Sequence, residues 1–364
     1  MSAGALAAVF TATGEPLRME RFALPELSAG ELLVKVTCCT VCGSDVHTYE
    51  GRRSTPVPTI LGHEIMGTVT ALPPGEPVCD ASGEPLQEGD RITWSIAANC
   101  GDCFFCENDI APKCEQLFKY GHEAIDERHP LSGGLAEYCH LAPGTPIVRV
   151  PDVLPDVVAC PANCATATVA GALRVGGDCR DQIVLIQGAG MLGLTASAMA
   201  HAQGAAEVIV CDIDEARLDL ARSFGASRCV SVADGLEELQ SVVAKVSSGR
   251  GVDIAVELSG APASVAAGLK LLRIGGTYVL IGSVYPADDV PVSAEWVVRR
   301  WLNVHGQHNY LAEDLVQAID FLTREQDNYP FAELVKTSFP LAAAEEAFEH
   351  TIRERALRVA VVPE

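Results

Sequence analysis

The sequence predicts a two-domain protein in which an irregular β domain is joined to a parallel α/β sheet. Its 364 residues suffice for about two domains of ordinary size. Before about residue 165, short β-like runs alternate with Pro- and Gly-rich turns. Between about residues 181 and 285, strand-like and helix-like segments alternate, which is typical of a parallel sheet covered by helices on both faces.

In the first region, residues 31–39, 67–72 and 90–98 have the composition of short strands. The turn signals between them include the segment Pro-Pro-Gly-Glu-Pro at 73–77. The last strand-like segment of the chain, residues 356–362, is expected to rejoin this first domain.

In the second region, each apolar strand-like run precedes a segment with helical periodicity. The expected strands are residues 182–187, 207–212, 252–258 and 277–282, and the expected helices are residues 191–203, 215–224 and 263–272. We therefore place the α/β domain at 165–301 and the β domain at 1–164 and 302–364.

The composition excludes several classes of partner. Acidic residues outnumber basic ones by 48 to 26, for a net charge of −22, so the surface should repel nucleic-acid phosphates and anionic lipids. No apolar run approaches the ~20 residues that a membrane span needs. The first 20 residues lack the basic start of a signal peptide, so a cytoplasmic location is expected.

A glycine-rich loop follows the first strand of the α/β region. Residues 188–193 read Gly-Ala-Gly-Met-Leu-Gly, and Asp212 lies at the end of the next strand. Gly188 would allow a tight turn, Gly190 a close approach of pyrophosphate, and Gly193 close packing of helix and strand, while Met191 and Leu192 open the helix. Asp212 would bind the adenine ribose and repel a 2′-phosphate, which favours NAD over NADP. The alternative is a Gly-rich loop of some other α/β protein.

Four of the 14 cysteines are crowded into one short segment. Thiolates at such spacing can complete a tetrahedral zinc shell with no open position, which is the structural type of zinc site. Buried free thiols or an iron–sulfur cluster are the alternatives. We expect a structural-zinc lobe at about 98–115, with the ligands Cys100, Cys103, Cys106 and Cys114.

A second metal site is indicated by residues that are far apart in sequence. Cys42, His63 and Cys164 form a Cys₂His set, which suits a catalytic zinc that keeps one position open. Glu64 could enter the shell transiently, and Asp45 could orient His63 through its second ring nitrogen. For any single cysteine, the alternative is a small buried hydrophobic side chain.

With these motifs in this order, the chain resembles the zinc-dependent medium-chain dehydrogenase/reductase family of alcohol and polyol dehydrogenases over nearly its whole length. The resemblance implies a GroES-like β-barrel catalytic domain with an inserted Rossmann domain, and an active site in the cleft between them. It also implies that the protein is a homodimer or homotetramer. The segments PANCATATVAGALR and FKYGHE are most similar to a subgroup associated with phosphonate metabolism.

The resemblance carries individual roles with it. Cys42, His63 and Cys164 match the catalytic zinc ligands, and Glu64 matches the acid that exchanges with water. Ser44 and His47 match a proton relay. Thr168 matches a residue that packs on the nicotinamide, and Arg217 matches a basic residue near the adenosine ribose.

The expected reaction is reversible hydride transfer between an alcohol and NAD. Arg53 and Lys119 could bind an anionic substrate such as a hydroxyalkylphosphonate, although Arg52 and Arg53 could equally be solvated loop residues. The alternatives are a polyol dehydrogenase of the sorbitol or threonine type, a thiol-conjugated aldehyde as substrate, and a catalytically idle relative that acts as a binding or structural protein.

Overall fold

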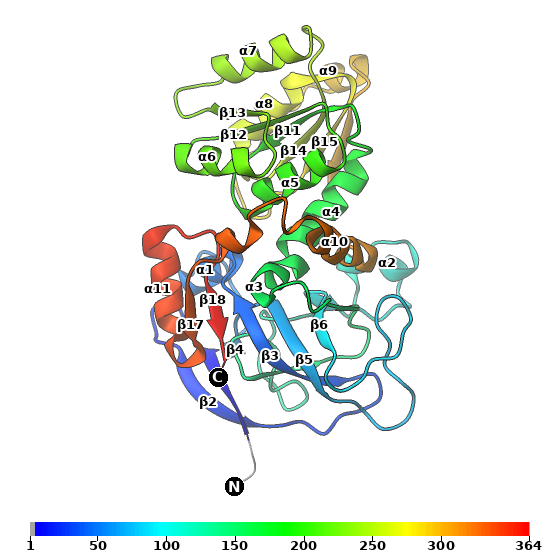
Figure 1. Ribbon diagram of the computed structural model, residues 1–364, viewed down its shortest axis with the longest axis vertical. Helices are drawn as coiled ribbons and strands as arrows, with labels where there is room; N and C mark the ends of the chain where they lie inside the picture. Colours follow the sequence, from blue (N-terminus) through cyan, green and yellow to red (C-terminus); the bar gives the residue numbers. More distant parts are fainter. Residues whose placement is uncertain (1–3, 364) are drawn as a thin grey trace. The chain divides into compact units, whose positions relative to one another are not determined.

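The β-rich region forms two main sheets in the computed structural model, which describes residues 4–363 (Figure 1). One sheet has the strand order β10-β6-β5-β3-β18-β17, with β9 also paired to β3, and the other has the order β2-β1-β4. The strands are β1 (Gly4–Phe10), β2 (Arg18–Ala23), β3 (Leu32–Thr40), β4 (Thr59–Ile60), β5 (Glu64–Ala71), β6 (Arg91–Trp94), β9 (Tyr138–Leu141), β10 (Ile147–Arg149), β17 (Ser338–Pro340) and β18 (Ala360–Val362).

Two of the expected strands differ in the structure. The run 90–98 is not continuous, because β6 ends at Trp94 and a separate strand, β7 (Ala97–Ala98), pairs with β8 (Phe118–Lys119). The C-terminal run does rejoin the first sheet through β18, which pairs antiparallel with β3. It is shorter than the expected 356–362 because only residues from Ala360 onward lie in the strand.

Short helices join these strands and carry several of the expected site residues. The helix α11 packs against α1 through a stacked pair, Tyr49 on Phe348, and through a hydrogen bond from the Tyr49 hydroxyl to Glu345. The helices of this region are α1 (Gly43–Tyr49), α2 (Phe104–Glu107), η1 (Ala111–Lys113), α3 (Asp156–Ala159), η2 (Cys160–Asn163), α4 (Ala165–Gly176), α10 (Ala312–Glu325), η3 (Phe331–Leu334), η4 (Leu341–Ala343) and α11 (Ala344–Glu354).

The alternating region forms one six-stranded parallel sheet. Its spatial order, β13-β12-β11-β14-β15-β16, is the doubly wound order of dinucleotide-binding folds. The strands are β11 (Ile183–Gln187), β12 (Glu207–Asp212), β13 (Arg228–Ser231), β14 (Val252–Glu257), β15 (Leu272–Leu280) and β16 (Asn303–Gly306), and the helices are α5 (Met191–Ala202), α6 (Glu215–Ser223), α7 (Glu237–Val246), α8 (Pro262–Leu271) and α9 (Ala294–Arg299).

The expected elements of this sheet are present, although β15 begins at Leu272 and ends at Leu280 instead of spanning 277–282, and the structure adds β13, α7, α9 and β16. Of the described residues, one unit holds 4–167, 311–326 and 331–363, and the other holds 168–310 and 327–330. The expected second boundary, at 301/302, lies before the observed boundary at 310/311. The reason is that β16 pairs with β15 and so belongs to the parallel sheet.

Within residues 4–363, no single helix is both long and apolar enough to cross a membrane. By length and composition alone, one bent pair passes that test: Asp156–Asn163 with Ala165–Gly176, at an angle of 53°.

Candidate active site

Four side chains from three separate segments of the sequence converge in the first unit. Cys42 caps the N-terminus of α1, His63 immediately precedes β5, Glu64 is the first residue of β5, and Cys164 ends η2. One potential ligand atom from each residue lies within 4.8 Å of the others. The structure therefore brings the three expected zinc ligands and the expected exchange acid into one cluster.

Asp45 fixes the orientation of the His63 ring. Its Oδ1 lies 3.0 Å from His63 Nδ1 and accepts a longer bond of 3.3 Å from the Gly62 N–H. Its Oδ2 accepts a bond of 2.9 Å from the Cys42 N–H, which ties the same carboxylate to the start of α1. Because Nδ1 is engaged, Nε2 is the nitrogen that faces the cluster, and the Ser44 hydroxyl lies 3.4 Å from it.

Arg358 is a site residue that the sequence reasoning missed. Its guanidinium binds Glu64 in a two-bond fork, with Nε to Oε2 and Nη2 to Oε1 both at 2.7 Å, and Nη2 also donates to Cys42 Sγ at 3.3 Å. Arg358 is 6% exposed and Glu64 is 0% exposed, so this is a buried ion pair. The available signal was a single arginine inside the apolar run ALRVAVV, since a buried arginine almost always has an anionic partner.

The cluster suits zinc by its donor chemistry. Two thiols and an imidazole are typical zinc ligands, and atoms bound to one zinc at about 2.0–2.3 Å lie within about 4.6 Å of one another. A hydrogen bond from the Cys164 thiol lowers the pKa of the Cys42 thiol well below its usual value, and the Arg358 charge lowers it further. Burial opposes both effects, so Cys42 is the thiol that ionises first.

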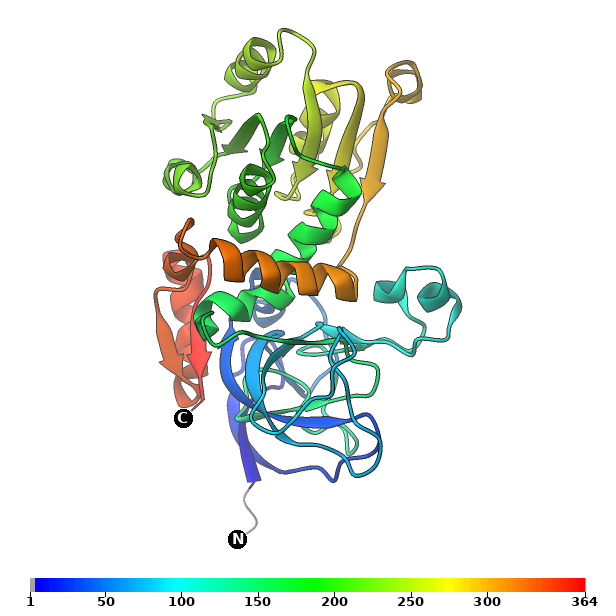
Figure 2. The ribbon, with the colours of Figure 1, turned by 45° about the vertical axis from the view of Figure 1, so that its right-hand side comes forward.

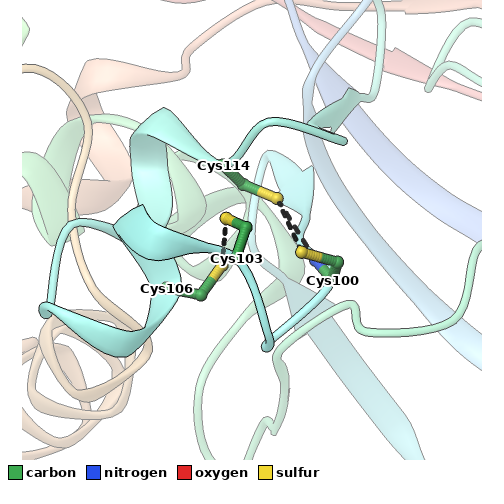
Figure 3. A group of neighbouring side chains, drawn as sticks. All are labelled: Cys100, Cys103, Cys106 and Cys114. Atoms are coloured by element: carbon green, nitrogen blue, oxygen red, sulfur yellow. Dashed lines mark hydrogen bonds between the residues drawn. The ribbon is translucent and has the colours of Figure 1, made fainter.

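The other cysteine group forms a lobe that stands away from the sheets of its unit, as Figure 2 shows in cyan. Cys100, Cys103, Cys106 and Cys114 point toward one another, with ligand atoms within 4.8 Å (Figure 3). The sulfurs of Cys100 and Cys114 are 3.4 Å apart, and those of Cys103 and Cys106 are 3.5 Å apart. A closed set of four thiols fits a structural zinc.

Backbone amides stabilise negative charge on two of the sulfurs of this lobe, those of Cys114 and Cys103. The N–H groups of Cys100 and Gln116 both donate to Cys114 Sγ at 3.3 Å. Backbone hydrogen bonds from Glu115 and Cys106 lower the pKa of Cys103 to about 6. Because metals bind the thiolate form, these donors favour metal binding in the lobe.

The expected relay residues share one short helix. Ser44 and His47 are three residues apart in α1, so they lie on the same helical face. His47 is half-buried, and its pKa is lowered from 6.5 by that burial and by the nearby Arg52 charge. A neutral imidazole in this position can accept a proton at neutral pH.

Arg53 and Lys119, the two expected substrate residues, reach the same region from different loops. The N–H of Arg53 donates to the carbonyl of His47 at 3.0 Å, and Lys119 ends β8. The two charges interact, since Arg53 is among the groups that lower the pKa of Lys119. Arg52, by contrast, is an exposed residue paired with Glu50 at 3.2 Å.

In the second unit, the glycine-rich loop leaves β11 and opens α5, as expected. Gly188 has a φ of +104°, which only glycine adopts readily. A Cβ on Gly193 would lie 1.8 Å from the Gly188 carbonyl oxygen, so a side chain there would break the packing of loop and helix. A Cβ on Gly190 would meet nothing within 4 Å, which leaves room for a pyrophosphate at the helix N-terminus.

Asp212 lies beside this loop at the end of β12. Its carboxylate accepts hydrogen bonds from the N–H groups of Ala189 at 2.5 Å and Asp214 at 3.0 Å. Arg217 follows in α6, with its guanidinium 3.8 Å from Asp214, and Thr168 is a buried residue of α4, one turn after Cys164. The loop and the acid at the next strand end are the arrangement expected for a dinucleotide.

Comparisons with known proteins agree with these features. Residues 28–152 match the alcohol dehydrogenase GroES-like domain, and residues 192–324 match the zinc-binding dehydrogenase family. The 5-exo-hydroxycamphor dehydrogenase of Pseudomonas putida is 33% identical over 92% of this chain and 93% of its own. An L-threonine 3-dehydrogenase of Anaeromyxobacter sp. (strain K) is 32% identical over 78% of this chain and 77% of its own.

The solved structures agree as well. An alcohol dehydrogenase from Thermotoga maritima covers 100% of both chains with a TM-score of 0.93 and 31% identity. The resemblance that the sequence motifs indicated is therefore confirmed at the level of the family and of its two-domain fold. The chain belongs to the zinc-dependent medium-chain alcohol dehydrogenase family.

Proposed function

We propose that this protein is a zinc- and NAD-dependent dehydrogenase that interconverts an alcohol and its aldehyde or ketone. The observation that supports this most strongly is the convergence of Cys42, His63, Glu64 and Cys164 within 4.8 Å in a chain of this family. The glycine-rich loop with Asp212 beside it supports NAD as the partner cofactor.

In this proposal Cys42, His63 and Cys164 hold the catalytic zinc, and Arg358 holds the Glu64 carboxylate by two hydrogen bonds. A bound zinc would supply Lewis acidity that makes an alcohol easier to deprotonate, and bound NAD would supply the hydride acceptor. Asp45 keeps His63 Nε2 directed into the cluster. The four cysteines of the lobe hold a second, structural zinc.

The proton leaves through α1. In this proposal Ser44 accepts the proton of the substrate hydroxyl, a role supported by the 3.4 Å distance from its Oγ to His63 Nε2. His47 lies on the same helical face, and its lowered pKa keeps it neutral and able to pass that proton to water. In the second unit, the N-terminus of α5 and Asp212 bind the pyrophosphate and ribose, with Arg217 near the adenosine. Thr168 packs on the nicotinamide in this assignment.

A panel of alcohols incubated with NAD⁺ and followed by NADH absorbance tests the proposal. The panel includes 5-exo-hydroxycamphor, L-threonine, sorbitol, simple alcohols and hydroxyalkylphosphonates. We expect turnover of at least one alcohol, and its loss in the variants His63→Ala and Cys164→Ser. Cys79→Ser, which changes an exposed thiol that belongs to neither cluster, should keep that activity and serves as the control.

The polyol and threonine type remains the second candidate, because L-threonine 3-dehydrogenases are about as similar to this chain as the hydroxycamphor dehydrogenase is. Selective turnover of sorbitol or L-threonine would favour it. Binding of zinc and NAD without turnover of any alcohol would favour the catalytically idle alternative and contradict the proposal.

We also propose that the enzyme is a cytoplasmic homodimer or homotetramer. Support for assembly comes from β16, an edge strand of the parallel sheet whose four residues are all exposed. Such an edge offers unpaired backbone groups to another strand.

A further inference from the structure

The loop 119–122 is fixed against the candidate zinc cluster. Gly121 has a φ of +73°, and a Cβ there would lie 2.7 Å from the Gly62 carbonyl oxygen and 3.1 Å from the backbone nitrogen of His63. The His122 ring lies 5.1 Å from the His63 ring, and its Nδ1–H donates to the Tyr120 carbonyl at 2.8 Å. Residues at the start of this loop are therefore held beside a ligand of the cluster.

Lys119 is the first residue of this loop, and its backbone is held by the neighbouring strand and by Glu123. Lys119 pairs with Ala97 in the two-stranded sheet, and its N–H donates to Glu123 Oε1 at 3.1 Å. Among residues 4–363, no carboxylate forms an ion pair with its ammonium group within 4.0 Å. Burial, followed by the repulsion of Arg53, lowers the pKa of Lys119 to about 8, so the group is still mostly charged at neutral pH.

Arg53 is held near the same loop by a bond of its own N–H and by the side chain of Thr55. The Arg53 N–H binds the His47 carbonyl, and two residues later the Thr55 hydroxyl donates to the His122 carbonyl at 3.0 Å. Arg53 is half-buried and, within the described part of the chain, has no carboxylate partner either. The neighbouring Arg52 differs in both respects, because it is exposed and paired with Glu50.

Two half-buried cations that repel each other raise the free energy of the folded protein. An anion bound between them would relieve that repulsion and would replace the water they lose on burial. The chain as a whole carries a net charge of −22, so its overall field disfavours anions. A positive site beside the cluster therefore needs local cations such as these.

We propose that Arg53 and Lys119 form an anion-binding subsite beside the zinc cluster, and that the alcohol substrate carries a carboxylate or phosphonate group there. This inference rests on the proposed function and adds the class of substrate. The planar guanidinium would bind such a group through two bonds, and the ammonium would act as a point charge.

The test compares matched alcohols on the zinc-loaded enzyme at pH 7. The substrates are 3-hydroxybutanoate, 2-hydroxypropylphosphonate and the neutral 2-butanol, and the quantity is the ratio of kcat/KM for each anion to that for 2-butanol. We expect Arg53→Leu and Lys119→Met each to lower this ratio by about 10- to 150-fold, the range for a lost charge-assisted hydrogen bond. Arg52→Leu, the matched control, should change it by less than about fivefold.

Calorimetric titration supplies a readout that does not depend on turnover. The probes are butanoate, propylphosphonate and neutral butanamide. We expect wild-type protein to bind one or both anions more tightly than butanamide, and Arg53→Leu and Lys119→Met to lose that preference. The anion that binds more tightly distinguishes a carboxylate substrate from a phosphonate substrate. Arg53→Lys and Lys119→Arg retain the charge and should keep most of the preference.

Ratios within about fivefold of wild type in both Arg53→Leu and Lys119→Met would overturn the subsite. Equal binding of butanoate, propylphosphonate and butanamide by wild-type protein would overturn it as well. If none of the alcohols is oxidised but the anions still bind through Arg53 and Lys119, the proposed function fails while the subsite is supported. If 2-butanol is oxidised but the wild-type protein shows no preference for anions, the proposed function is supported and the subsite fails.

Discussion

The chemistry of the candidate active site depends on two residues that are not themselves expected metal ligands. Asp45 binds three partners at once, from the N-cap of α1 to the residue before β5, and so fixes both Cys42 and His63. Arg358 neutralises Glu64 and donates to Cys42. Each acts through a neighbouring side chain, which makes both of them positioning residues.

The first prediction at the residue scale concerns Arg358. In Arg358→Met, the Glu64 carboxylate stays buried without its partner, so we expect the first unit to lose about 3–5 kcal/mol of unfolding free energy. Denaturant titration measures this loss. Arg353→Met, which removes an exposed arginine paired with Glu354, should cost only about 0–1 kcal/mol. If Arg358→Met also lost only about 0–1 kcal/mol of unfolding free energy, the buried ion pair would not be needed for stability.

The second concerns the choice of cofactor. Asp212→Asn removes a charge while keeping an oxygen that can accept the Ala189 N–H. The preference for NAD⁺ over NADP⁺ should fall at least about fivefold, because like charges about 4 Å apart repel by about 1 kcal/mol even in water. Steady-state kinetics with both cofactors give the ratio. Asp219→Asn, on the exposed side of α6, is the control, and a wild-type enzyme that already prefers NADP⁺ would refute this role for Asp212.

The third concerns pH. His47 accepts a proton only when it is neutral, that is, above its pKa. Burial, followed by the Arg52 charge, lowers that pKa below 6.5. The Arg53 charge adds to this effect, whereas Glu50 and Cys42 oppose it. The acidic fall of kcat/KM should therefore lie below pH 6.5, so the enzyme stays active in mildly acidic solution. In His47→Gln, the rate should drop about 10²–10⁴-fold, and the fall with acid should disappear. An unchanged pH profile in that variant would exclude His47 from the relay.

At the scale of elements, the two metal sites differ in how they are built. The lobe takes all four ligands from the single segment 100–114, whereas the other cluster draws on the N-cap of α1, the start of β5 and the end of η2. Four thiols can saturate a zinc, but a Cys₂His set leaves a position open to solvent or substrate.

We therefore expect two zinc ions per chain with different resistance to chelators. Incubation with EDTA should remove the zinc of the Cys42–His63–Cys164 site first, together with the activity, while the zinc of the lobe is retained longer. Metal analysis of samples withdrawn over time measures both losses. A double variant, Cys103→Ser with Cys106→Ser, should contain one zinc per chain. Fully folded wild-type protein with one zinc or none would contradict the two-site assignment.

At the scale of the whole molecule, the edge of the parallel sheet carries an exposed apolar surface. Among residues 4–363, no strand pairs with the outer side of β16, and close to it in sequence Val298 is 77% exposed and Trp301 is 80% exposed. Large apolar side chains exposed beside an unpaired strand commonly mark an interface between subunits.

The mass in solution should accordingly be two or four times the 38.4 kDa of one chain. Light scattering coupled to gel filtration measures it. Trp301→Lys places a charge in the exposed apolar surface and should shift the protein toward smaller species, whereas Val153→Lys changes an exposed valine of the other unit and should not. A wild-type mass of a single chain would rule out the homo-oligomer.

The sequence alone was sufficient for features that depend on local order. The fold class followed from hydrophobic periodicity, and the glycine-rich loop and the lobe followed from spacing, because all their residues lie within one turn or one short segment. The pairing of β18 with β3 also agreed with the expectation from the C-terminal apolar run. β13, α7, α9 and β16 were missed, and the position of β16 in the sheet moved the domain boundary.

Only the tertiary structure decided which distant residues meet. Glu64 and Arg358 are 294 positions apart, and nothing in either local segment specifies that their charges form a buried pair. The same is true of Lys119 and Arg53, whose charges interact because Gly121 allows one loop to pack directly on the His63 backbone. Periodicity and spacing report on neighbours along the chain, whereas burial, charge pairing and shifted pKa values arise from contacts that form only when the chain has folded.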